Sequence, residues 1–113
     1  MPDIEIVATD TFSEWYQNLD DRDAEAVTRS VTLLEQLGTT LGYPHSSEIK
    51  GSQFAMRELR VQSGGRPIRV LYAFDPKRQA VLLIAADKTG DDRFYDWIVP
   101  KADEIFRNYL DGD

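Results

Sequence analysis

The sequence predicts one α+β domain over residues 1–113, in which a small, twisted, mostly antiparallel sheet carries two amino-terminal helices on one face and a carboxy-terminal helix follows. Two observations lead to this prediction. The period of the apolar residues changes between two and about 3.6, and the changes give the order strand, helix, helix, strand, strand, strand, helix. The 113 residues, of which 42% are hydrophobic, also suit one hydrophobic core and leave too little chain for a second domain.

The amino-terminal third is predicted to form a strand and two antiparallel helices. Residues 3–8 place apolar side chains at alternate positions, the period of a strand with one better-buried face. Thr11 and Glu14 have the spacing of a capping box, so we expect a short amphipathic helix to begin at Thr11. Acidic residues at 20–23 favour the amino end of a second helix, and Gly38 supplies its left-handed end.

The middle of the chain is predicted to contain a loop and a hairpin. Residues 39–55 show no period and include Gly42, Pro44 and Gly51, which indicates a loop. Apolar and polar residues then alternate over 58–62 and again over 68–74, with the turn sequence SGGRP between them. This pattern is typical of a β-hairpin.

A further strand and a helix complete the predicted fold. DPKR at 75–78 suits a type I turn, and residues 80–86 form the most apolar strand, which we expect to be central in the sheet. After a turn at 88–92, the apolar positions of residues 98–110 have helical spacing. We expect Pro100 in the first turn of this helix, where a missing N–H is tolerated.

The net charge of −7 is unevenly distributed along the chain. Residues 1–49 carry −8, residues 50–93 carry +4, and residues 94–113 carry −3. The basic middle segment suits either a local anion-binding surface or ordinary solvated strands, and charge alone leaves both interpretations open.

Several classes of chemistry are excluded by composition. The chain has no cysteine, which excludes disulfides, a thiolate nucleophile and zinc sites that use sulfur. His45 is the sole histidine, so a two-histidine acid/base pair cannot form within one chain. No glycine-rich phosphate loop, GxSxG elbow or HExxH helix is present, and we expect neither a cofactor nor a metal. Without an apolar run of about 20 residues or a signal-like start, we expect a cytoplasmic protein that does not enter the membrane.

The remaining candidates for chemistry are cationic side chains. They are Lys50, Arg57, Arg60, Arg66, Arg69, Lys88 and Arg93. Such groups bind phosphate oxygens and stabilise the charge that develops on phosphorus during phosphoryl transfer. Period-two alternation points Arg60 and Arg69 to the same side, and Lys88 follows the last strand, so we expect these heads to meet on the helix-free face of the sheet. Spacing alone also permits solvated charges that keep sheet edges from pairing.

Sequence segments along the whole chain resemble a known family. They are FSEWYQNL, IKG, MRELRV, IRVLYAF, VLLIAADKT and IVPKADEIFRNYL. In these segments the chain resembles the RelE/HigB family of toxins from type II toxin–antitoxin modules, particularly its phage-derived HigB-like branch. The resemblance implies a RelE-like fold and a ribosome-dependent endoribonuclease, in which a ribose 2′-hydroxyl of the messenger attacks the adjacent phosphate without a metal.

The resemblance also implies site residues and partners. By position, the catalytic residues are Arg60, Arg69, Lys88 and Tyr95. Arg69 would bind the scissile phosphate, Arg60 or Lys88 would act in proton transfer, and Tyr95 would stack on a base or donate a hydrogen bond. The residues that would hold the RNA backbone are Lys50, Arg57, Arg66 and Arg93. The expected partners are the ribosome, messenger RNA and a helix-turn-helix antitoxin in a hetero-oligomeric complex.

Two other functions remain open on the same fold. One is a ParE-like toxin that binds DNA gyrase and cleaves nothing, and the other is an inactive relic that only binds an antitoxin. Retention of Arg60, Arg69 and Lys88 favours the nuclease. The acidic net charge, in contrast, reduces long-range attraction to ribosomal RNA.

Overall fold

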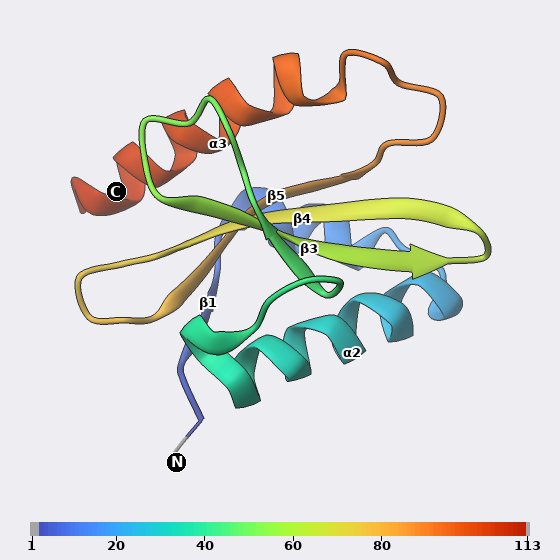
Figure 1. The fold of residues 1–113 in the computed structure, drawn as a ribbon, viewed down its shortest axis with the longest axis horizontal. Coiled ribbons are helices and arrows are strands. Elements are labelled where there is room, and N and C mark those ends of the chain that lie inside the picture. The colour runs from blue at the N-terminus through green and yellow to red at the C-terminus, as the bar shows by residue number, and fades with distance from the viewer. Residues whose placement is uncertain (1–2, 113) are drawn as a thin grey trace.

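Five strands form one sheet in the computed structural model, which describes residues 3–112 (Figure 1). They are β1 (Ile6–Ala8), β2 (Ser46–Glu48), β3 (Met56–Ser63), β4 (Arg66–Phe74) and β5 (Ala80–Asp87). Their order across the sheet is β1-β5-β4-β3-β2, with β1 parallel to β5 and every other neighbouring pair antiparallel. The predicted α+β class with an antiparallel-rich sheet is therefore confirmed.

Helices cover both faces of this sheet. They are α1 (Asp10–Gln17), α2 (Asp21–Leu37), the short 3₁₀ helix η1 (Gly38–Thr40) and α3 (Phe94–Leu110). Figure 1 shows α2 on one side of the sheet and α3 on the other. None of the helices in the described range is long and apolar enough to cross a membrane.

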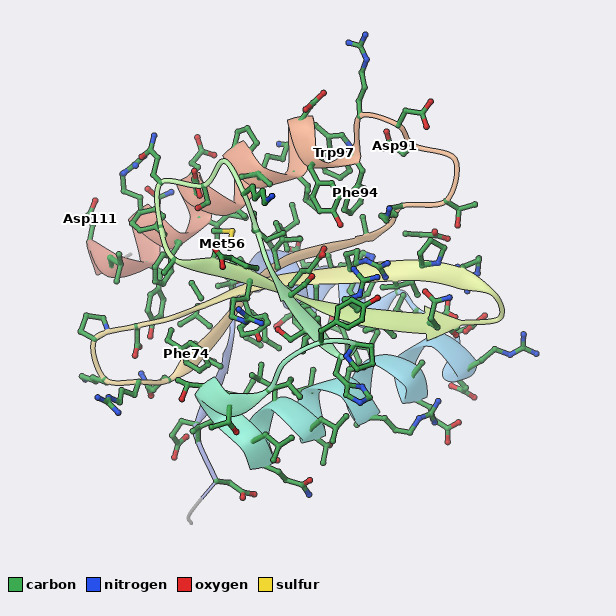
Figure 2. The ribbon with its side chains drawn as sticks, in the orientation of Figure 1. Met56, Phe74, Asp91, Phe94, Trp97 and Asp111 are labelled. Carbon is green, nitrogen blue, oxygen red and sulfur yellow. The ribbon has the colours of Figure 1, made fainter. Side chains whose placement is uncertain are left out.

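The expectation of a helix-free face is wrong, because α3 packs there. The sheet is apolar on both sides: Tyr72 belongs to the core beneath α1 and α2, whereas Leu71 and Leu83 belong to a second core beneath α3. Figure 2 shows Met56 and Phe94 between the sheet and α3. A sheet with two apolar faces needs a helix packed on each face. The alternation of residues within one strand does not reveal which helix packs on which face.

The boundaries of two helices differ from the prediction. Thr9, rather than Thr11, caps α1: its hydroxyl oxygen accepts a hydrogen bond from the Phe12 N–H (3.4 Å) and donates to the Leu82 carbonyl (2.8 Å). Because that second bond reaches β5, local spacing could not show it. Helix α3 begins at Phe94, so Pro100 lies inside the helix instead of in its first turn. Pro100 is exposed, so water can bind the Asp96 carbonyl that lacks the N–H donor of an ordinary residue at position 100.

The sheet is also larger and differently centred than expected. The predicted loop over 39–55 contains β2, which pairs with the outer edge of β3. Three residues are too few to show a period, so sequence reasoning missed this strand. The middle strand is β4, whereas the most apolar strand, β5, is an interior strand between β1 and β4.

Candidate functional site

Polar side chains from four elements meet on the α3 side of the sheet. Glu58 and Arg60 project from β3, Arg69 projects from β4, Lys88 follows β5, and Tyr95 lies in the first turn of α3. Arg60 and Arg69 are direct cross-strand partners, and Glu58 shares their face because it is two residues from Arg60. We call these five residues the Glu58 cluster.

The carboxylate of Glu58 lies at the centre of the cluster. Its Oε1 accepts a hydrogen bond from the Tyr95 hydroxyl (2.7 Å), and its Oε2 accepts one from the Ser47 hydroxyl (2.9 Å). The Arg60 Nη1 lies 3.6 Å from Oε2, and the Arg69 Nε lies 3.8 Å from Oε1. Glu58 is only 4% exposed, so one buried carboxylate orients two guanidinium groups and a phenol.

Arg69 is a buried guanidinium with unused hydrogen-bonding capacity. It is 5% exposed, and its Nη1 donates to the Ile68 carbonyl (3.2 Å). Within residues 3–112 its Nε has no hydrogen-bond acceptor, since the 3.8 Å separation from Glu58 is too long for a hydrogen bond. The planar fork of arginine matches phosphate geometry, and a phosphate would reach this buried group only if the side chains that cover it moved aside.

Tyr95 and Lys88 complete the cluster. Burial raises the pKa of Tyr95 to about 12, and the hydrogen bond to Glu58 adds to this shift while Arg69 opposes it. The phenol therefore keeps its proton at neutral pH and acts as a donor. The Lys88 ammonium lies 5.7 Å from the centroid of the Tyr95 ring, within cation–π range.

One of the predicted RNA-binding cations lies beside this cluster, and a second is close to it in the sequence. Lys50 lines a pocket of about 320 Å³ together with Glu48, Ile49, Glu58 and Tyr95. Arg93 is exposed and directly precedes α3, two residues before Tyr95.

The structure separates the other two predicted RNA-binding residues from the cluster. Arg57 points to the opposite side of β3 from Glu58, and its Nε donates to the Ser46 hydroxyl (3.1 Å). Arg66 forms ion pairs with Asp23 (2.5 Å) and Asp87 (3.0 Å). The reason is tertiary: the end of the β3–β4 hairpin lies against the amino end of α2, where Asp23 binds both Arg66 and Ser63.

Neutralising Asp23 is expected to lower thermal stability near pH 7 and to have little effect in acid. Hydrogen bonds from Arg66 and then Ser63 lower the pKa of Asp23 below its ordinary 3.8. Because the folded-state pKa is depressed, the carboxylate stabilises the fold above about pH 4, and this stabilisation is lost as the pH falls through the folded-state pKa. In thermal melts, Asp23→Asn should therefore lower Tm by several degrees at pH 7, and the difference should shrink below pH 4.

Asp21→Asn is the matched control for this measurement, since Asp21 is an exposed carboxylate in the first turn of the same helix. It should change Tm only slightly. If the Tm difference between Asp23→Asn and the wild type stays constant down to pH 2.5, the ionised Asp23 carboxylate is not the source of the stabilisation.

Sequence reasoning missed the central residue of the site. By sequence pattern Glu58 is an ordinary polar strand residue, although it is two residues from Arg60 in the segment MRELRV. The available signal was that Glu58 is the one acidic residue on the face of the hairpin that also carries Arg60 and Arg69. The described residues contain no group of three or more histidine, aspartate or glutamate side chains placed to hold a metal.

Known proteins are similar to this chain in sequence. Residues 14–107 match the family described as "Phage derived protein Gp49-like (DUF891)". HigB3 of Mycobacterium tuberculosis is 46% identical over 99 residues, which cover 85% of this chain and 84% of HigB3. HigB2 of the same organism is 41% identical over 101 residues, which cover 87% of this chain and half of HigB2.

The fold is also found among solved structures. The free-state structure of a mutant of the E. coli toxin RelE aligns with a TM-score of 0.60 over 85% of this chain and 95% of that chain, at 6% sequence identity. At that identity the likeness concerns the fold alone. The family match and the HigB relatives go further: the chain belongs to the phage-derived Gp49-like family of HigB/RelE-type toxins.

Proposed function

We propose that this protein is a ribosome-dependent endoribonuclease that cleaves messenger RNA without a metal. The observation that supports the proposal is the Glu58 cluster, in which Arg60 of β3, Arg69 of β4 and Tyr95 of α3 surround one carboxylate, and Lys88 at the end of β5 lies against the Tyr95 ring. Three cations and one buried anion give the cluster a net positive charge, and such a site suits a phosphodiester. Membership of the HigB/RelE-type family supports the same substrate class.

The cluster suits an internal transfer at phosphorus. The ribose 2′-oxygen forms a bond to phosphorus, the bond from phosphorus to the 5′-oxygen breaks, and the messenger ends in a 2′,3′-cyclic phosphate. Arg69 binds a non-bridging oxygen and stabilises the extra negative charge of the pentacoordinate transition state. Glu58, with both oxygens already accepting hydrogen bonds, is a positioning residue that orients Arg69 and Tyr95.

Proton transfer falls to Lys88 in this proposal. An arginine does not lose its proton in proteins, so Arg60 contributes charge and not acid/base chemistry. The Lys88 ammonium donates a proton to the departing 5′-oxygen, and the 2′-hydroxyl proton passes to solvent water. Lys50, which lines the pocket beside the cluster, and the exposed Arg93 hold the flanking RNA backbone. A helix-turn-helix antitoxin is the proposed cognate partner that restrains the activity.

Replacing Lys88 by alanine tests the proposed function in cells. Induction of the wild-type protein should arrest growth and yield messenger fragments whose ends are in phase with codons. Lys88→Ala should reduce cleavage by about 100- to 10,000-fold, the usual contribution of a general acid, and should relieve the arrest. Primer extension on a reporter messenger measures the cleavage.

Lys77→Ala is the matched control for this experiment. Lys77 is an exposed lysine in the turn before β5, at the opposite end of that strand from Lys88. It should behave as the wild type. Growth arrest that survives Lys88→Ala while messengers stay intact would instead favour inhibition of gyrase.

A further inference from the structure

An exposed aromatic ring lies beside the Glu58 cluster. Tyr43 precedes β2 and is 77% exposed, the largest exposed fraction among the large hydrophobic side chains of residues 3–112. Single exposed aromatics are ordinary on protein surfaces. Tyr43 differs from such residues in what it contacts.

The ring of Tyr43 packs on a residue of the cluster. The Arg60 guanidinium carbon lies 5.3 Å from the centroid of this ring, and the Arg60 Nη1 is 3.6 Å from Glu58. One guanidinium therefore links the exposed ring to the central carboxylate. Cation–π contact of this kind favours a fixed relative position of the ring and the charge.

The backbone around Tyr43 is also attached to the site. The Arg60 N–H donates to the His45 carbonyl (2.8 Å), and the His45 N–H donates to the Gly42 carbonyl (3.0 Å). Ser46, the first residue of β2, is paired with Leu59 on β3. The turn that carries Tyr43 is thus hydrogen-bonded to the strand that supplies Glu58 and Arg60.

We propose that Tyr43 is a stacking platform for a nucleobase of single-stranded RNA next to the cleaved phosphate. The inference rests on the proposed function. A phosphate bound at the cluster, where Arg60 is the more exposed guanidinium, brings its flanking nucleotides over the same face of β3, and the exposed Tyr43 ring offers them a flat apolar surface. Aromatic rings stack on every base with little sequence preference, and a guanidinium behind the ring strengthens the stack.

Solution NMR on the intact protein tests this platform. The probe is a four-nucleotide RNA with 2′-O-methyl riboses, which binds but cannot be cleaved because the attacking hydroxyl is blocked. The ring resonances of Tyr43 should move upfield on titration. Tyr43→Leu should weaken binding by about 5- to 100-fold, the contribution of one stacked base, whereas Tyr43→Phe should stay within about twofold of the wild type.

Trp97→Leu is the control for loss of an exposed aromatic. Trp97 lies in the first turn of α3, where its indole N–H donates to Asp91 (2.9 Å), and Figure 2 shows it next to Asp91 and Phe94. This change should leave the affinity for RNA unaltered, and the urea midpoint of each variant verifies that it folds.

Three results would overturn the platform: Tyr43 resonances that stay still while RNA binds elsewhere, no binding at millimolar RNA, or movement of Tyr43 only with a protein partner. Cleavage on ribosomes, measured separately, distinguishes this failure from failure of the proposed function. If ribosomes show cleavage but the Tyr43 ring resonances do not shift on RNA titration, the platform is wrong and the proposed nuclease stands. If RNA shifts the Tyr43 resonances but no cleavage occurs on ribosomes, the proposed nuclease function is wrong and Tyr43 remains an RNA-binding residue.

Discussion

Arg69→Ala is expected to lower kcat/KM for messenger cleavage by about 100- to 1,000-fold, the usual cost of removing one pre-organised donor to a developing anion. Arg69 is the buried guanidinium of the cluster, and its donors are incompletely used within the described part of the protein. Removing it takes away the group proposed to stabilise the transition state. Single-turnover cleavage of a short messenger on purified ribosomes measures the loss.

Two variants separate this chemical role from a general loss of charge. Arg29→Ala removes an exposed arginine from α2 and should cleave as the wild type does. Arg69→Lys keeps the charge but loses the planar fork, so it should recover only part of the activity. If a folded Arg69→Ala protein cleaves at the wild-type rate, Arg69 does not stabilise the transition state.

Long periodic segments are what the sequence could predict here. Alternation over 58–62 and 68–74, joined by a glycine turn, determines both the hairpin and its faces. Because that register pairs Arg60 with Arg69, the convergence of two cluster cations follows from the alternation of the two strands alone. The position of Lys88 after the last strand also followed from the pattern, and the family resemblance assigned catalytic roles to Lys88 and Tyr95, which lie on other elements.

Contacts between distant segments could not be predicted in this way. The strand β2 has no period, and it brings Ser47 to Glu58 and places Tyr43 beside Arg60. Arg66 has the same local pattern as the other cations, yet it forms an ion pair with Asp23, 43 residues away along the chain. The buried member of this pair is Asp23, whose carboxylate needs a partner away from water, and spacing along the sequence does not report which residues are buried.

Glu58→Leu is expected to lower the free energy of unfolding at pH 7 by about 3 kcal/mol, near the lower end of the usual cost of removing one partner of a buried ion pair. The reason is that Arg69, 5% exposed, would lose its counter-charge. Urea denaturation measures the change. Glu48→Gln, at an exposed carboxylate of neighbouring β2, is the control and should stay within about 0.5 kcal/mol of the wild type.

A double variant shows whether Glu58 acts through Arg69. If the cost of Glu58→Leu comes from a stranded guanidinium, Glu58→Leu/Arg69→Met should regain much of the lost stability, because an apolar pair of similar volume often replaces a buried ion pair at little cost. Equal losses in the single and double variants would mean that Glu58 stabilises the fold only through Tyr95 and Ser47. The rescued protein should nevertheless fail to cleave RNA, since the site would then be stable without the charge that binds phosphate.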